Sequence, residues 1–178
     1  MTNQEKQPLY LVTLTCLNCE NLFETPKVRL SFKRTVRKDS DFCGYYRTIN
    51  PEYYVVRVCP HCGFSTTENF EEKLSDVHRK EIFEKISSNW VPRDYSGERN
   101  WEEALQTYKL ALICAQIKEE KPRVIAGLLH HIAWLYREKG NKEMELKFLE
   151  FALDAYIQVY ESESAETNNA RLMYMIGE

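Results

Sequence analysis

Residues 59–63 read Cys-Pro-His-Cys-Gly, and residues 16–19 read Cys-Leu-Asn-Cys. Each pair leaves two residues between its cysteines and follows a run with strand character. A two-residue spacer lets one tight turn direct two thiolates at a single ion, and four thiolates suit tetrahedral zinc. The two pairs therefore predict one zinc ion per chain, with these ligands: Cys16, Cys19, Cys59 and Cys62.

Two other interpretations of the cysteine pairs carry less weight. The pairs could be buried thiols whose spacing coincides by chance. Thioredoxin-like redox chemistry would need one pair at the start of a helix in a βαβ unit, and neither pair has that context. Four thiolates also close the coordination shell, whereas a catalytic zinc keeps a position for water. The predicted site is therefore structural.

Two further cysteines and one histidine lie near these patterns. Cys43 stands in Asp-Phe-Cys-Gly-Tyr-Tyr and could either replace a ligand or pack as a small buried hydrophobe. Cys114 lies among apolar helical residues and is expected in the core. His61 lies between two ligands and is expected to be exposed.

The composition of the 178 residues is that of an ordinary globular protein, with a net charge of -3. The apolar run after the polar start is too short for a secretory signal or a spanning helix. We therefore expect a cytoplasmic protein without membrane contact, in which reduced cysteines serve metal or redox chemistry rather than disulfides. Residues 1–66 carry nine basic against six acidic residues, and the remainder carries fifteen against twenty-one.

The first part of the chain, from Tyr10 to about Thr67, has strand character. Its clearest signals are apolar residues that alternate with charged ones (Val28, Leu30, Phe32) and a β-branched and aromatic run (Tyr53–Val58). After Thr67 the apolar residues recur at helical spacing. The first helical segment is predicted to bury a stripe formed by Leu74, Val77, Ile82, Phe83, Ile86 and Trp90.

Three strong helices are predicted after a loop at 91–100: Trp101 to about Lys118, Val124 to Lys139, and Lys142 to about Tyr160. The predicted fold class is α+β. A small zinc-ribbon-like antiparallel β module occupies residues 1–67, and an all-α array of TPR-like helical hairpins occupies residues 68–178.

The helical half matches the spacing of a tetratricopeptide unit over residues 129–152. Glu145 departs from the pattern, because a small residue is expected at its position. Partial matches lie at 104–111 and 173–177, and the last one leads us to expect a longer natural chain. An ordinary helical bundle with similar apolar spacing is the alternative.

The same periodicity predicts a partner-binding face. Leu129, Ile132, Ala133 and Tyr136 are expected to face the core, which places other side chains together on a second face of that helix. The candidate partner-binding residues, including two matching positions in the next unit, are His130, Trp134, Arg137, Arg171 and Tyr174. Alternatively, Trp134 is covered by the rest of the chain and enlarges the core.

A basic segment suggests nucleic-acid binding as the runner-up function. Six basic residues fall within residues 27–38, which contain no acid. The candidate contacts are Lys33, Arg34 and Arg37. On one continuous strand, however, alternation would place Lys33 and Arg37 on one face and Arg34 on the other, so half of them would form a solvated face. The acidic overall charge also disfavours nucleic acid.

The cysteine motifs and the helical pattern together resemble an uncharacterised bacterial family, domain-of-unknown-function family 2225. The resemblance rests on Cys16–Arg29, Asp41–Cys43, Tyr54–Gly63 and the helical segment, and it covers nearly the whole chain. It implies the architecture predicted above but no activity.

The leading functional hypothesis is an adaptor that binds a protein or peptide on its helical surface. An enzyme is third, since the chain contains no zinc-protease helix, no phosphate-cradling glycine loop and no nucleophile elbow. His130 and His131 are adjacent on a helix and point about 100° apart, so they do not easily share one metal.

Overall fold

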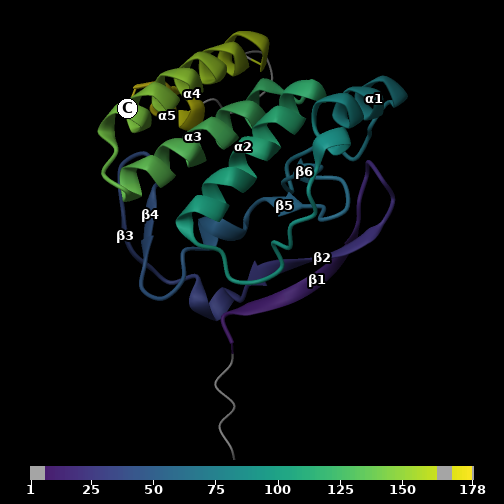
Figure 1. Cartoon of the computed structure of the whole chain (residues 1–178). Coiled ribbons are helices and arrows are strands. Elements are labelled where there is room, and N and C mark those ends of the chain that lie inside the picture. The colour runs from purple at the N-terminus through teal and green to yellow at the C-terminus, as the bar shows by residue number, and fades with distance from the viewer. Residues whose placement is uncertain (1–6, 164–169, 178) are drawn as a thin grey trace, which may run out of the picture.

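The computed structural model describes residues 7–163 and 170–177. Helices gather on one side of the molecule and three short antiparallel strand pairs lie along the other (Figure 1). The fold class is therefore α+β, as predicted. The strands pair in order of sequence: β1 (Leu9–Thr15) with β2 (Leu22–Val28), β3 (Thr35–Lys38) with β4 (Gly44–Tyr46), and β5 (Arg57–Val58) with β6 (Ser65–Thr66).

The helices follow the strands along the chain. They are α1 (Asp76–Lys85), α2 (Trp101–Ile117), α3 (Pro122–Glu138), α4 (Lys142–Glu163) and α5 (Ala170–Gly177). The three strong helices predicted from periodicity are confirmed to within a few residues at their ends. Helices α3 and α4 form the most extensive helical pair, flanked by α2 and α5 (Figure 1).

Local sequence explains where these helices begin and end. Asn100 and Glu103 form a reciprocal capping box at the start of α2, and Pro122 supplies a preset backbone angle at the start of α3. Gly140 adopts a φ of 68° after α3, which ends that helix. The Asn141 side chain then accepts a hydrogen bond from the Met144 amide as α4 begins.

The strand prediction was wrong in two places. Leu30–Phe32 and Pro51–Tyr54 form short 3₁₀ turns, η1 and η2, and a third turn, η3, covers Ser87–Asn89. The backbone therefore bends after β2, and residues 27–38 do not share one strand. Leu30 is 85% exposed rather than part of an apolar sheet face. Pro51 favours a turn because it lacks an amide hydrogen for a strand ladder.

The stripe predicted around α1 is only partly buried. Ile82 and Ile86 are buried, and Leu74 and Trp90 pack against the core, but Val77 and Phe83 are exposed. Helix α1 contacts the rest of the protein along one narrow side. The helix has ten residues, and the side that carries Val77 and Phe83 stays exposed to solvent.

One core cluster joins the strands to the helices. It includes Phe23, Val56 and Phe64 from the β segment together with Tyr108 and Ile132 from α2 and α3. Arg99, which is 6% exposed, donates to the carbonyls of Tyr53 and Val56 and so fixes the start of α2 to the β segment. The division at residue 67 stays a prediction, but the two segments pack on each other.

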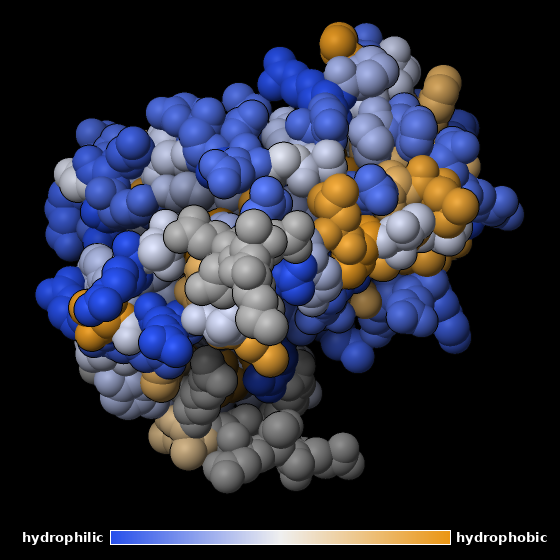
Figure 2. All heavy atoms as spheres, turned by 90° about the horizontal axis from the view of Figure 1, so that it is seen from below, coloured by the Kyte–Doolittle hydropathy of each residue, from blue (hydrophilic) through white to orange (hydrophobic). Residues whose placement is uncertain are grey.

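Seen from below, the surface divides by hydropathy (Figure 2). Hydrophobic side chains gather on the side that carries the β1–β2 hairpin, where Leu11 and Leu22 are exposed, and hydrophilic side chains predominate on the side of β3 and β4. No helix among the described residues combines the length and the apolar content needed to cross a bilayer.

Candidate metal centre and helical face

The two cysteine pairs fold into matching turns. In each turn, the residue after the second cysteine has a positive φ, 62° at Glu20 and 75° at Gly63. The amide of that residue donates to the carbonyl of the first cysteine, Cys16 or Cys59, over 2.9 Å. A glycine adopts this backbone conformation at little cost, whereas Glu20 adopts it with strain. The repeated geometry directs both side chains of a pair to the same side of the turn.

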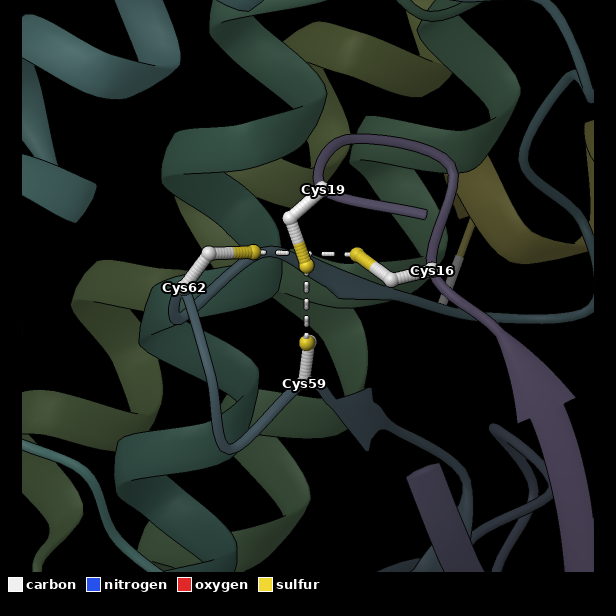
Figure 3. A group of neighbouring side chains, drawn as sticks. All are labelled: Cys16, Cys19, Cys59 and Cys62. Atoms are coloured by element: carbon white, nitrogen blue, oxygen red, sulfur yellow. Dashed lines mark hydrogen bonds between the residues drawn. The ribbon is translucent and has the colours of Figure 1, made fainter. Parts of the chain in front are cut away.

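These turns bring all four sulfurs together. The turn after β1 and the turn after β5 face each other, and their side chains converge on one point (Figure 3). The Sγ atoms of Cys16 and Cys62 lie 3.6 Å apart, as do those of Cys19 and Cys59, and all four lie within 4.8 Å of one another. A tetrahedron of sulfurs about 2.3 Å from zinc has edges of about 3.8 Å. The cluster therefore fits a tetrahedral metal ion.

The surroundings favour thiolates that are shielded from water. Cys16, Cys59 and Cys62 are buried, and Cys19 accepts a hydrogen bond from the Asn21 side-chain amide over 3.4 Å. Hydrogen bonds with Cys59 and Cys62, together with burial, raise the pKa of the Cys16 thiol, whereas a hydrogen bond from Cys16 lowers the pKa of Cys62. Four thiols this close do not all ionise unless a cation neutralises them.

The neighbouring residues take other roles. Cys43 is not part of the four-sulfur group; it is 7% exposed, and burial raises its pKa to about 12. Cys114 is fully buried in α2, and its sulfur accepts a hydrogen bond from the Ser65 amide. His61 is exposed, with Nε2 3.3 Å from the Leu22 carbonyl oxygen.

The helical face predicted from periodicity holds a segment of this same chain. His130, Trp134 and Arg137 of α3 all reach the Asp41 carboxylate, which lies in the loop between β3 and β4. Trp134 Nε1 donates to Asp41 Oδ2 over 2.8 Å, and Arg137 donates to it over the same distance. We call residues 39–42 the hairpin tip. Sequence periodicity brought these helical residues together correctly, but it did not identify Asp41.

More contacts extend this network. Arg137 also pairs with Asp39 at 3.1 Å and with Glu145 at 2.8 Å. Glu145, the residue that departs from the repeat pattern, is therefore a buried partner of Arg137. The Tyr174 hydroxyl donates to the Ser40 carbonyl at 3.0 Å. The side chain of Arg171 lies outside the part of the structure that is described.

The network changes the acidity of its members. Burial alone would raise the pKa of Asp41, but hydrogen bonds from His130, Arg137 and Trp134 hold that pKa well below its ordinary range. Burial alone would lower the pKa of Arg137, but hydrogen bonds with Asp41 and Glu145 raise it. The hairpin tip is therefore bound to the helices as an ion pair at neutral pH.

A groove of about 420 Å³ lies beside the hairpin tip, between α4 and α5. Its walls are largely apolar, and His130, Arg137 and Lys142 lie at its polar end. The apolar wall residues are Leu146, Leu149, Leu153, Met175 and Ile176. The sequence pattern did not identify them as a binding site, although the repeated apolar positions of α4 were a signal.

A partly buried His–Glu pair was missed as well. His131 Nε2 lies 3.0 Å from Glu52 of η2, and its Nδ1 lies 2.6 Å from the Gly127 carbonyl oxygen. The Tyr46 hydroxyl donates to the same Glu52 carboxylate. The pair joins α3 to the β segment and lines a cavity of about 170 Å³ that also includes Cys43 and Trp134.

The basic segment does not present the faces predicted for a continuous strand. Lys33 and Arg34 are exposed between η1 and β3. Arg37 lies over the Tyr45 ring at 4.1 Å and pairs with Asp39 at 3.3 Å. The bend at η1 is the reason for the difference, because it separates Lys27 and Arg29 from the rest.

Comparison with protein families identifies a family whose model covers most of the chain. A family described as an uncharacterized protein conserved in bacteria (DUF2225) matches residues 9–178. The comparisons with curated proteins and with solved structures each gave no significant match.

Proposed function

The chain belongs to this uncharacterized bacterial family, and we propose that it is a zinc-containing adaptor that binds a peptide segment of a partner protein. The single observation that supports binding most directly is the groove between α4 and α5. The proposal includes no catalytic role. We place the protein in the cytoplasm, because thiolate ligands persist in a reducing compartment.

Zinc is the ion we assign to the four cysteines. The thiolate set, the spacing of the pairs and sulfur separations of 3.6 Å all suit tetrahedral zinc. A bound zinc would hold the β1–β2 and β5–β6 turns together through four ligand bonds. Since all four ligands come from the protein, the ion would have a structural role.

The groove has the properties of a peptide site. A volume of about 420 Å³ accommodates a few side chains, and partly exposed leucines offer apolar contact area that water otherwise covers. Leu146 is 48% exposed and Leu153 is 37% exposed. We assign as partner an amphipathic segment that inserts apolar side chains between α4 and α5. We infer that α3, α4 and α5, which pack in sequence on one another, form a TPR-like stack, and such stacks suit this mode of binding.

The test is affinity capture of the full-length protein from its own cells, with and without nuclease. The decisive comparison is between Leu146→Asp, which places a charge in the groove, and Val77→Asp, which places one on α1. Val77 is 67% exposed, so both substitutions alter exposed apolar residues. We expect Leu146→Asp alone to lose the captured protein.

Other outcomes contradict the proposal. Equal capture by the two variants would remove the groove as the binding site. A captured protein that disappears after nuclease treatment would favour the nucleic-acid alternative through Lys33 and Arg34. Circular dichroism of each variant shows whether a loss of capture comes from unfolding.

A further inference from the structure

A second surface hollow lies at the open end of the β3–β4 pair, away from the groove and the cysteines. Its volume is about 550 Å³. The residues around it are polar, cationic or apolar, and none of them is acidic: Ser31, Phe32, Arg34, Thr35, Val36, Arg47 and Thr48. These residues come from the η1–β3 segment and from the two positions that follow β4.

The strand register places two arginines together. Thr35 pairs with Tyr46 in the last rung of the ladder, so Arg34 and Arg47 are the next residues on the two strands. Like charges opposite each other on paired strands destabilise the pair. Elsewhere in this hairpin Arg37 has Asp39 as a partner, but within the described residues neither Arg34 nor Arg47 has an ion pair or a side-chain hydrogen bond.

From these observations we infer that the Arg34–Arg47 hollow binds the phosphate group of a small phosphate ester. Two guanidinium groups provide planar sets of donors that match phosphate oxygens. Thr35 and Thr48 line the same hollow, and a threonine hydroxyl is a neutral donor for a phosphate oxygen. The bound anion would remove the repulsion between the two arginines.

The rest of the chain favours a small ligand over a long polyanion. Residues 67–178 carry a net charge of -6, from fifteen basic and twenty-one acidic residues, and would repel an extended nucleic-acid strand. Phe32 is partly buried and lines the hollow, so its ring offers a surface for a flat group attached to the phosphate. A mononucleotide has this combination and is a suitable probe.

The test is calorimetric titration of the full chain, in chloride buffer, with inorganic phosphate, adenosine monophosphate and a single-stranded oligonucleotide. We expect one adenosine monophosphate to bind per chain, more tightly than inorganic phosphate. Arg34→Gln and Arg47→Gln should each weaken binding about tenfold or more. The matched control is Arg93→Gln, since Arg93 is exposed outside the hollow, and it should leave affinity within about twofold.

Three results would overturn the inference. The first is the absence of saturable binding of either small ligand to the wild-type protein. The second is an equal loss of affinity in Arg93→Gln. The third is preferential binding of the oligonucleotide with a steep salt dependence, which would identify a nucleic-acid surface. None of these results depends on the groove between α4 and α5.

Discussion

The Arg137 guanidinium lies 2.8 Å from the Asp41 carboxylate, although 96 positions separate the two residues in the sequence. This contact joins the β3–β4 hairpin to α3. Because Arg137 also binds Asp39 and Glu145, one side chain connects the hairpin, α3 and α4. Its partners are mostly buried, so loss of one of them leaves unpaired charge away from water.

Asp41→Ala is expected to lower the free energy of unfolding by about 3 kcal/mol at pH 7. The lowered pKa of Asp41 means that its contribution is present above the unfolded-state pKa, about 4, and is lost as pH falls below that value. The difference between wild type and variant, measured by urea unfolding, should therefore narrow below about pH 4. Asp154→Asn, on the exposed side of α4, is the control. An equal effect of both substitutions would contradict a role for the network.

The His131–Glu52 pair predicts an opposite dependence on pH. Burial alone would lower the pKa of His131, but the hydrogen bond and charge of Glu52 raise it above its ordinary value. Its contribution to stability is therefore complete below about pH 6.5 and is lost as pH rises through the higher folded-state pKa. In urea unfolding, the wild type should have a lower free energy of unfolding at pH 8 than at pH 6. Glu52→Gln should reduce this difference. If His78→Gln, at a partly buried position on α1, reduces it equally, the assignment is wrong.

Metal analysis of the native protein should find one zinc per chain. Cys59→Ser should lose the metal, and chelation should do the same to the wild-type protein. We expect unfolding of the β segment, with much of the α3–α4 helical signal retained in circular dichroism. Cys43→Ala removes a buried thiol outside the sulfur cluster and should keep its zinc. Metal-free native protein, or loss of zinc from Cys43→Ala, would contradict the assigned ligands.

A nonspecific oligonucleotide should not bind this chain, even at low salt. Lys33 and Arg34 are exposed, but Arg37 is engaged by Asp39 and Tyr45, and the helical segment is acidic. Fluorescence anisotropy at about 20 mM and 200 mM salt checks this expectation. A complex that forms at low salt and dissociates at high salt would instead support phosphate-backbone contacts.

The features that could be predicted from the sequence are those that depend on residues close together in the chain. The cysteine pairs and the helical periods each depend on neighbouring residues, so Cys16, Cys59 and the ends of α2 could be placed without a structure. The 3₁₀ turn at Leu30–Phe32 was missed because its apolar residues also fit strand alternation. The contact between Asp41 and Arg137 could not be predicted, since no local pattern specifies which loop packs against a helix. The groove depends on how α5 packs against α4, which is also a tertiary property.

The order of the sulfur ligands along the chain also bears on folding during synthesis. All four cysteines have been translated once residue 62 is added, whereas Arg137 follows 75 positions later. At about 5–20 residues per second, this delay is about 4–15 s. A metal ion bound as proposed would close the loop of residues 16–62 while the ribosome is still adding the helices. Helix α3 would then emerge beside a hairpin whose ends are already fixed, and docking of Asp41 would be a late step of folding.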